Sequence, residues 1–115
     1  MYKLVVMDID GTLLTSDKKI GEYTKNIIQN YSNKVKIVLA SARGFCTIKN
    51  FLLELNLVDN NNYTIAYNGG LISKNSGEII FKENIVTNKL ELLEEYIKKW
   101  NNSEWFYYFY EDRIN

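Results

Sequence analysis

The fold is decided by the apolar stretch Leu4-Val5-Val6-Met7 and by Asp8-Ile9-Asp10-Gly11-Thr12-Leu13-Leu14, which follows it directly. The apolar stretch is typical of a buried strand, so the two acids stand at its carboxyl end, where ligands bind in α/β folds. Because side chains alternate between the faces of a strand, Asp8 and Asp10 are expected to point the same way, and Gly11 allows a sharp turn beyond them. Two such carboxylates favour a hard divalent cation such as Mg²⁺, which leaves room for phosphate oxygens.

Alternating strands and helices follow this first strand. Apolar residues at helical spacing predict helices over residues 22–31 and 45–56, and short β-branched runs predict strands over residues 35–40 and 63–67. This alternation predicts an α/β fold with a Rossmann-like parallel sheet and right-handed crossovers. Ligands of such a sheet collect at the carboxyl ends of its strands.

The pattern changes after residue 70. Residues 71–73 and 78–81 flank a short connection typical of a β-hairpin, residues 90–100 predict an amphipathic helix, and residues 105–110 predict an aromatic strand. The aromatic run could also stack on bases or sugar rings, but a buried strand is favoured because no net charge attracts a polyanion. We therefore expect the α/β pattern to give way to an α+β part over residues 71–115.

Composition excludes several classes of protein. The 115 residues are 46% hydrophobic and 24% charged, which suits a soluble globular domain, and 14 basic residues balance 14 acidic ones. With zero net charge, neither nucleic acid nor a membrane surface is expected as a partner. The start of the chain fits neither a signal peptide nor a membrane span, so a cytoplasmic location is expected.

Histidine is absent, and Cys46 is the sole cysteine. The absence of histidine excludes Ser-His-Asp and Cys-His chemistry and argues against zinc. Cys46 cannot form an intrachain disulfide and falls within the apolar spacing of a predicted helix, so it is interpreted as a small core residue in a reducing compartment. Carboxylates, Lys, Ser, Thr and backbone amides remain to carry any catalysis.

Polar signals also follow the second and third predicted strands. Ser41 ends the second strand ahead of Ala42-Arg43-Gly44, and Asn68-Gly69-Gly70 ends the third. From the residues alone, Ser41 is either a functional hydroxyl or a helix cap, and Arg43 is either an anchor for an anionic substrate or a solvated side chain. Asn68-Gly69 is either part of a site or a plain turn.

Together these motifs resemble those of the haloacid dehalogenase-like (HAD) hydrolases, which are mostly phosphatases. The string from Asp8 to Leu14 is similar to the first signature of that superfamily, and Ser41 is similar to the second. Ser41-Ala42-Arg43 resembles the Thr-Gly-Arg of the Cof-type subfamily, with Ser for Thr and Ala for Gly. Asn68-Gly69-Gly70 resembles the Asn-Gly-Ala that leads into the inserted cap of that subfamily. The resemblance implies that residues 1–70 are the N-terminal part of a HAD-like core and residues 71–115 the beginning of a cap.

The resemblance also implies roles for the motif residues. Asp8 would attack phosphorus and form an aspartyl-phosphate, and Asp10 would donate a proton to the leaving oxygen and then activate water. Mg²⁺ would be held at Asp8 and Asp10, in the latter case by the backbone carbonyl. The Ser41 hydroxyl would hold a phosphoryl oxygen. The full set expected to contact phosphate or substrate is Gly11, Thr12, Ser41, Ala42, Arg43, Asn68 and Gly69.

The function implied is that of a Mg²⁺-dependent phosphatase of a small phosphorylated metabolite, and a phosphomutase or phosphotransferase of the same superfamily is the alternative. The family also requires a third-signature Lys and a final acidic pair, which these 115 residues do not supply, so we expect weak or no turnover from the chain alone. A second alternative is an inactive fragment that serves only as an association module. Homo-oligomers would then form through an exposed sheet edge or the aromatic surface of the cap.

Overall fold

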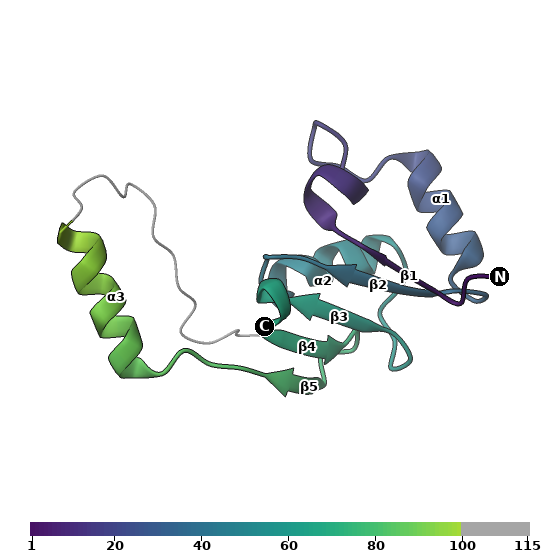
Figure 1. The fold of residues 1–115 in the computed structure, drawn as a ribbon. Helices are drawn as coiled ribbons and strands as arrows, with labels where there is room; N and C mark the ends of the chain where they lie inside the picture. Colours follow the sequence, from purple (N-terminus) through teal and green to yellow (C-terminus); the bar gives the residue numbers. More distant parts are fainter. Residues whose placement is uncertain (100–115) are drawn as a thin grey trace.

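The computed structural model describes residues 1–99 of the chain. Its elements follow the order β1 (Leu4–Met7), α1 (Glu22–Tyr31), β2 (Lys36–Ala40), α2 (Phe45–Glu54), β3 (Tyr63–Ala66), β4 (Leu71–Lys74), β5 (Ile79–Lys82) and α3 (Thr87–Lys99) (Figure 1). Single irregular turns follow β1 at Ile9–Leu13 and β3 at Tyr67–Gly69. Every helix and strand predicted for these residues is present, and the aromatic strand predicted over residues 105–110 lies outside the described residues.

The strands form one five-stranded sheet in the order β1-β2-β3-β4-β5. β1 pairs with β2, and β2 with β3, in parallel, with Val6 opposite Val38 and Leu39 opposite Thr64. The α/β expectation is therefore confirmed for the first three strands, but the sheet is mixed, because β4 pairs antiparallel with β3 and β5 antiparallel with β4. The connection from β3 to β4 is too short for a crossover, and such a connection allows only antiparallel neighbours.

The hairpin β4–β5 thus extends the same sheet beyond residue 70 instead of beginning a separate layer. Residue 70 marks the change from parallel to antiparallel pairing. The division of the chain into a core over residues 1–70 and a cap over residues 71–115 stays a prediction.

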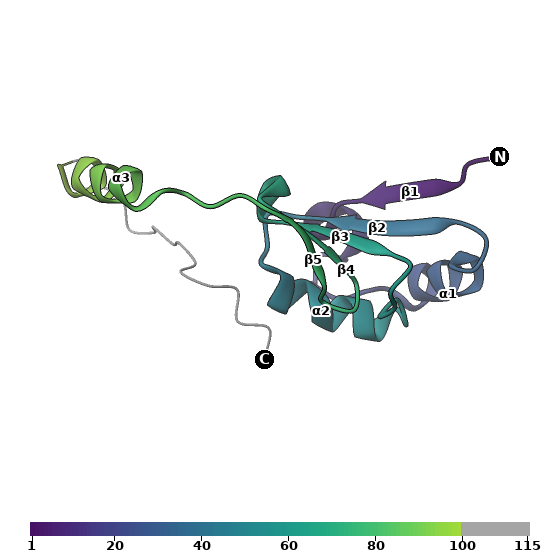
Figure 2. The ribbon, with the colours of Figure 1, turned by 90° about the horizontal axis from the view of Figure 1, so that it is seen from below.

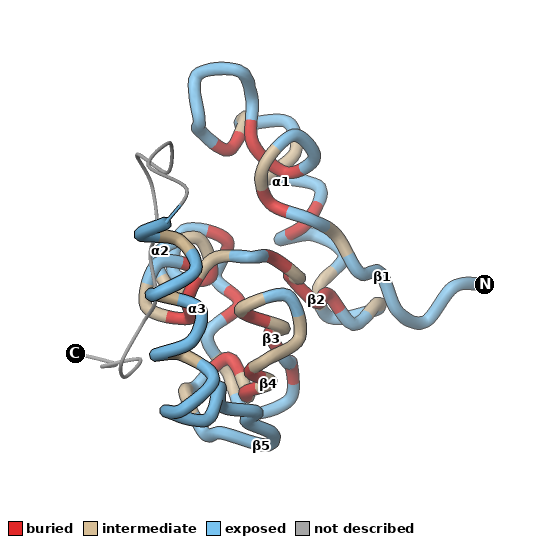
Figure 3. Tube along the Cα trace, turned by 60° about the vertical axis from the view of Figure 1, so that its left-hand side comes forward, coloured by how far each residue is buried: buried red, intermediate tan, exposed pale blue. Residues whose placement is uncertain are grey.

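Helices α1 and α2 lie on the same face of the sheet and cover its core (Figure 2). Phe45, Ile48 and Leu52 of α2 recur at helical spacing, and each is 0% exposed, as is Leu39 of β2 beneath them. Fully burying a side chain of this size contributes about 1.5–3 kcal/mol. Figure 3 shows buried residues in the central strands and α2, and also in α1 and in loops outside the sheet, among them Ile9 and Leu13 in the turn after β1. Cys46, expected in the core, is only half-buried, because it lies beside this stripe and not within it.

The opposite face of the sheet carries no helix in the described part of the chain (Figure 2). Apolar residues remain accessible there: Leu4 and Val6 of the edge strand β1 are 53% and 52% exposed, and Tyr63 of β3 is 41% exposed. Helix α3 stands apart from the sheet after the extended segment 83–86, and none of its residues is buried (Figure 1). Residues 1–82 therefore form the compact unit that positions the site.

Candidate active site

The turn after β1 places two carboxylates at the edge of the sheet. β1 ends at Met7, and Asp8 continues in extended backbone, with its Oδ1 accepting a hydrogen bond from the Ile9 N–H at 2.8 Å. Ile9 is fully buried and fixes the turn to the core. Gly11 has a φ of +81°, and a Cβ added there would meet no heavy atom within 4 Å, so glycine is needed for its backbone conformation and not for space.

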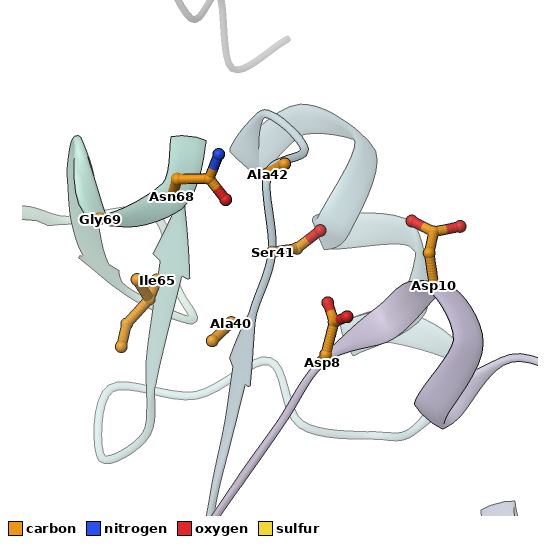
Figure 4. Close-up of a pocket in the computed structure, with 8 residues that line it drawn as sticks. All are labelled: Asp8, Asp10, Ala40, Ser41, Ala42, Ile65, Asn68 and Gly69. Atoms are coloured by element: carbon orange, nitrogen blue, oxygen red, sulfur yellow. The ribbon is translucent and has the colours of Figure 1, made fainter.

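A pocket of about 500 Å³ opens at the carboxyl ends of β1, β2 and β3 (Figure 4). Its lining residues come from the three strand ends and the loops that follow: Asp8, Asp10, Ala40, Ser41, Ala42, Ile65, Asn68 and Gly69. The structure thus brings together six of the residues predicted from the motifs. Gly11, Thr12 and Arg43 are not among the lining residues.

Two lining residues were missed by sequence reasoning. Ala40 and Ile65 are opposite each other in the β2–β3 register and supply the apolar part of the pocket wall. Their position could have indicated them, because Ala40 is the last residue of β2 and Ile65 the last but one of β3, and ligands bind at the carboxyl ends of such strands.

Ser41 is 7% exposed, and its hydroxyl faces the same space as the Asp8 carboxylate (Figure 4). Its Oγ accepts a hydrogen bond from the Arg43 N–H at 3.1 Å, and its own N–H donates to the Ile65 carbonyl at 3.0 Å. The N-cap of α2 is Gly44, so the helix-cap alternative for Ser41 is wrong. Because Oγ acts as the acceptor in its bond to Arg43, the hydroxyl proton can still be donated to a ligand.

The loops after β2 and β3 are tied together by backbone hydrogen bonds. The Asn68 N–H donates to the Ser41 carbonyl at 3.1 Å, and the Tyr67 N–H donates to the Arg43 carbonyl at 3.0 Å. Asn68 forms a turn with a φ of +53°, a conformation that Asn tolerates better than most residues, and it also lines the pocket. The two alternatives for Asn68 are therefore compatible, since the turn is what places the residue there.

Arg43 reaches from the β2–α2 loop to Asp10. Its Nε donates to Asp10 Oδ2 at 2.7 Å and its Nη2 to Asp10 Oδ1 at 2.9 Å, while Lys18 Nζ lies 3.5 Å from Oδ1. These hydrogen bonds, those from Arg43 above all, lower the pKa of Asp10 from 3.8 to about 2, although partial desolvation opposes them. The same contact raises the pKa of Arg43. Asp10 is therefore ionised at neutral pH in this geometry.

The donor set suits a hard cation but is small. Asp8 and Asp10 offer oxygen ligands, and Mg²⁺ commonly binds through one or two carboxylates while it keeps several waters. Within residues 1–99, no group of three or more His, Cys, Asp or Glu side chains is placed to hold a metal ion. The donors thus fit Mg²⁺ in chemical type, and water, phosphate or further residues would have to complete its coordination shell.

Within residues 1–99, no helix is long and apolar enough to cross a membrane.

The chain is similar to known proteins in sequence. Residues 5–114 match the family model of the haloacid dehalogenase-like hydrolases. The chain is 40% identical over 73 residues to the putative phosphatase YxeH of Bacillus subtilis, a match that covers 63% of this chain and 27% of the relative. It is 30% identical over 94 residues to the HMP-PP phosphatase of Yersinia pestis, or 81% of this chain and 33% of that protein. The chain therefore spans about a third of the length of these curated relatives.

Solved structures give the same result. A haloacid dehalogenase-like hydrolase from Bacteroides thetaiotaomicron superposes with a TM-score of 0.77 at 29% identity, over 86% of this chain and 38% of that one. A protein from Thermotoga maritima superposes with a TM-score of 0.72 at 33% identity, over 88% of this chain and 37% of that one. Motifs, fold and family model agree, and the chain belongs to the haloacid dehalogenase-like hydrolases.

Proposed function

We propose that the pocket at the ends of β1, β2 and β3 is the nucleophile half of a Mg²⁺-dependent phosphatase site. The observation that carries the proposal is the placement of Asp8 and Ser41, whose carboxylate and hydroxyl face one space from adjacent parallel strands (Figure 4). Asp8 would attack phosphorus and form an aspartyl-phosphate, and Ser41 would donate its hydroxyl proton to a phosphoryl oxygen.

Asp10 would exchange protons with the leaving oxygen and with water. It stands beside Asp8 at the pocket, and in the geometry of the Arg43 contact it is ionised, which is the form that accepts a proton from attacking water. To protonate the leaving oxygen in the preceding step, Asp10 would first have to take up a proton, and the Arg43 contact disfavours that protonated form. Asp8 and the Asp10 backbone carbonyl would hold Mg²⁺. When bound, the cation would offset the charge of the phosphoryl group and of Asp8.

The substrate class we propose is a small phosphorylated metabolite, as the phosphatase names of the relatives suggest. Three further predicted contacts of that substrate, Ala42, Asn68 and Gly69, line the same pocket, whereas Gly11, Thr12 and Arg43 do not. Because the chain spans about a third of its relatives, full catalysis is proposed for a protein of their length. From this chain alone we expect weak or no turnover, since no third acidic ligand stands at the pocket in the described residues.

The test is therefore one that does not need turnover. Beryllium fluoride mimics the phosphoryl group on an aspartate, and a bound species has its own ¹⁹F NMR signal. We expect a Mg²⁺-dependent bound signal in the wild-type chain and in Asp17→Asn, a matched variant of an exposed loop acid outside the pocket. Asp8→Asn should lack it. A bound signal that survives in Asp8→Asn, or none in the wild type, would contradict the role of Asp8.

Self-association is a second property we propose, because within residues 1–99 β1 is an edge strand and the exposed side chains of Leu4, Val6 and Tyr63 form an apolar sheet face beside it. Static light scattering of the chain should give a mass above 13.5 kDa that rises with concentration. Val6→Lys should lower that mass, and a wild-type monomer at all concentrations would contradict this proposal.

A further inference from the structure

Arg43 is held from two sides in the structure. Its guanidinium makes a bidentate contact with Asp10, at 2.7 and 2.9 Å, and its central carbon lies 5.5 Å from the centroid of the Phe51 ring. The first contact joins residues 33 positions apart, and the second joins the β2–α2 loop to the helix that follows. Among the described residues, the guanidinium therefore contacts a carboxylate, which fixes its direction, and an aromatic ring, which supports it.

Phe51 is suited to this support. It is half-buried and packs against the core cluster, so its ring is fixed by its neighbours on one side. An aromatic face attracts a guanidinium electrostatically and accepts its planar shape, whereas an aliphatic side chain offers no such attraction. Phe51 also belongs to α2, whose buried stripe attaches the helix firmly to the sheet.

We propose that Arg43 is a positioning residue for Asp10, and that Phe51 sets the place of Arg43. Phe51, on the packed helix α2, contacts the Arg43 guanidinium. The guanidinium in turn donates hydrogen bonds to both oxygens of the Asp10 carboxylate. The contacts fix the torsion of a half-exposed side chain that would otherwise rotate freely. The benefit of this fixed Asp10 orientation to the reaction rests on the proposed function, in which the Asp10 carboxyl group must meet the leaving oxygen at a defined position.

This role differs from the one predicted for Arg43 from the sequence, which is to bind an anionic substrate. The described bonds of the guanidinium go to a carboxylate of the chain itself, and Arg43 is not among the residues that line the pocket. If Arg43 bound the substrate instead, a phosphoryl mimic would move the Arg43 guanidinium away from Asp10. The two roles can therefore be separated by following the guanidinium directly.

The experiment is ¹H–¹⁵N NMR of the arginine Nε–H groups in the full chain. The sequence has two arginines, Arg43 and Arg113, so the signal that disappears in Arg43→Lys is that of Arg43. We expect the Arg43 Nε–H to exchange with solvent more slowly than that of free arginine and to lose its distinct shift in Asp10→Asn. Phe51→Leu should speed exchange at Arg43 about two- to fivefold, the change in population that corresponds to an exposed cation–π contact.

Two control variants separate support by the ring from a general effect on folding. Phe51→Tyr keeps the aromatic face and should restore slow exchange, and Leu53→Ala, at a residue of the same helix that is 58% exposed, should leave the signal unchanged. Circular dichroism confirms that each variant is folded. The inference is overturned if Phe51→Leu behaves as the wild type, or if Mg²⁺ with beryllium fluoride moves the Arg43 signal as far as Asp10→Asn does. Because these signals are read without turnover, a failure here is distinct from a failure of Asp8 to bind beryllium fluoride.

Discussion

Gly44 is the residue whose substitution tests the packing of the site most directly. A Cβ at Gly44 would lie 2.6 Å from the Tyr67 hydroxyl oxygen, 2.9 Å from Cζ and 3.1 Å from Cε1. The Gly44 backbone is extended, with a φ of −70°, so an alanine there meets no conformational strain. Apart from effects on the helix cap and on the unfolded chain, the cost of Gly44→Ala therefore comes from the collision with the Tyr67 ring, which adjoins Asn68 at the pocket.

The magnitude follows from comparison with Gly21. Gly21 is the N-cap of α1 with a φ of −67°, as Gly44 is the N-cap of α2, but its Cβ would meet only Thr15 Cγ2 at 3.7 Å, an ordinary contact. Effects on the cap and on the unfolded chain are thus shared by both variants. Overpacking costs about 1–3 kcal/mol, which is the expected difference between them in the free energy of unfolding. For a chain of this size about 1 kcal/mol corresponds to roughly 4 °C, so the melting temperatures should differ by about 4–12 °C.

The assay is thermal unfolding followed by far-ultraviolet circular dichroism for wild type, Gly44→Ala and Gly21→Ala. Tyr67→Phe in the Gly44→Ala background removes the nearest collision and should recover part of the loss, because Cζ remains at 2.9 Å from the new Cβ. Equal melting temperatures for Gly44→Ala and Gly21→Ala would refute the reasoning. So would a loss in Gly44→Ala that Tyr67→Phe does not change.

Two further outcomes are expected. The pKa of Asp10 is lowered from 3.8 to about 2 in the folded chain, so the Arg43 contact stabilises the fold above about pH 4 and loses its effect as the pH falls through 2. The difference in urea midpoint between wild type and Asp10→Asn should shrink over that range, and a constant difference would contradict this. Asn75 is 0% exposed, accepts from Thr64 Oγ1 and donates to the Leu57 carbonyl, both at 2.8 Å. Asn75→Ala should lower the free energy of unfolding in urea by about 2–4 kcal/mol, whereas Asn60→Ala, in an exposed loop, should lower it by less than about 0.5 kcal/mol.

Local patterns in the sequence were sufficient for the elements of the fold. The helix predicted over residues 22–31 is α1 (Glu22–Tyr31), and the helix predicted from residue 45 begins there as α2. Helical and strand periodicity are properties of a short window, so a single segment contains the information. The gathering of Asp8, Ser41 and Asn68 was also predictable, because parallel strands bring their carboxyl ends to one edge of a sheet.

The contacts that shape the site were not predictable in this way. Arg43 was interpreted as either an anchor for an anionic substrate or a solvated side chain, yet the structure pairs it with Asp10, 33 positions away, and places Phe51 beside it. Gly44 was quoted only as part of a motif, yet it is the position where the Tyr67 ring comes closest to the α2 cap. No local pattern marks either pair.

The sequence by itself was enough to identify the family signatures, the alternation of strands and helices, and the three strand ends that form the site, because each of these depends on a short continuous segment. Only the tertiary structure decided that β4 and β5 extend the same sheet, that Ser41 is not a helix cap and that the Arg43 fork is aimed at Asp10. The physical reason is that strand register and side-chain pairing depend on which distant segments meet in space, and that is settled when the helices pack on the sheet.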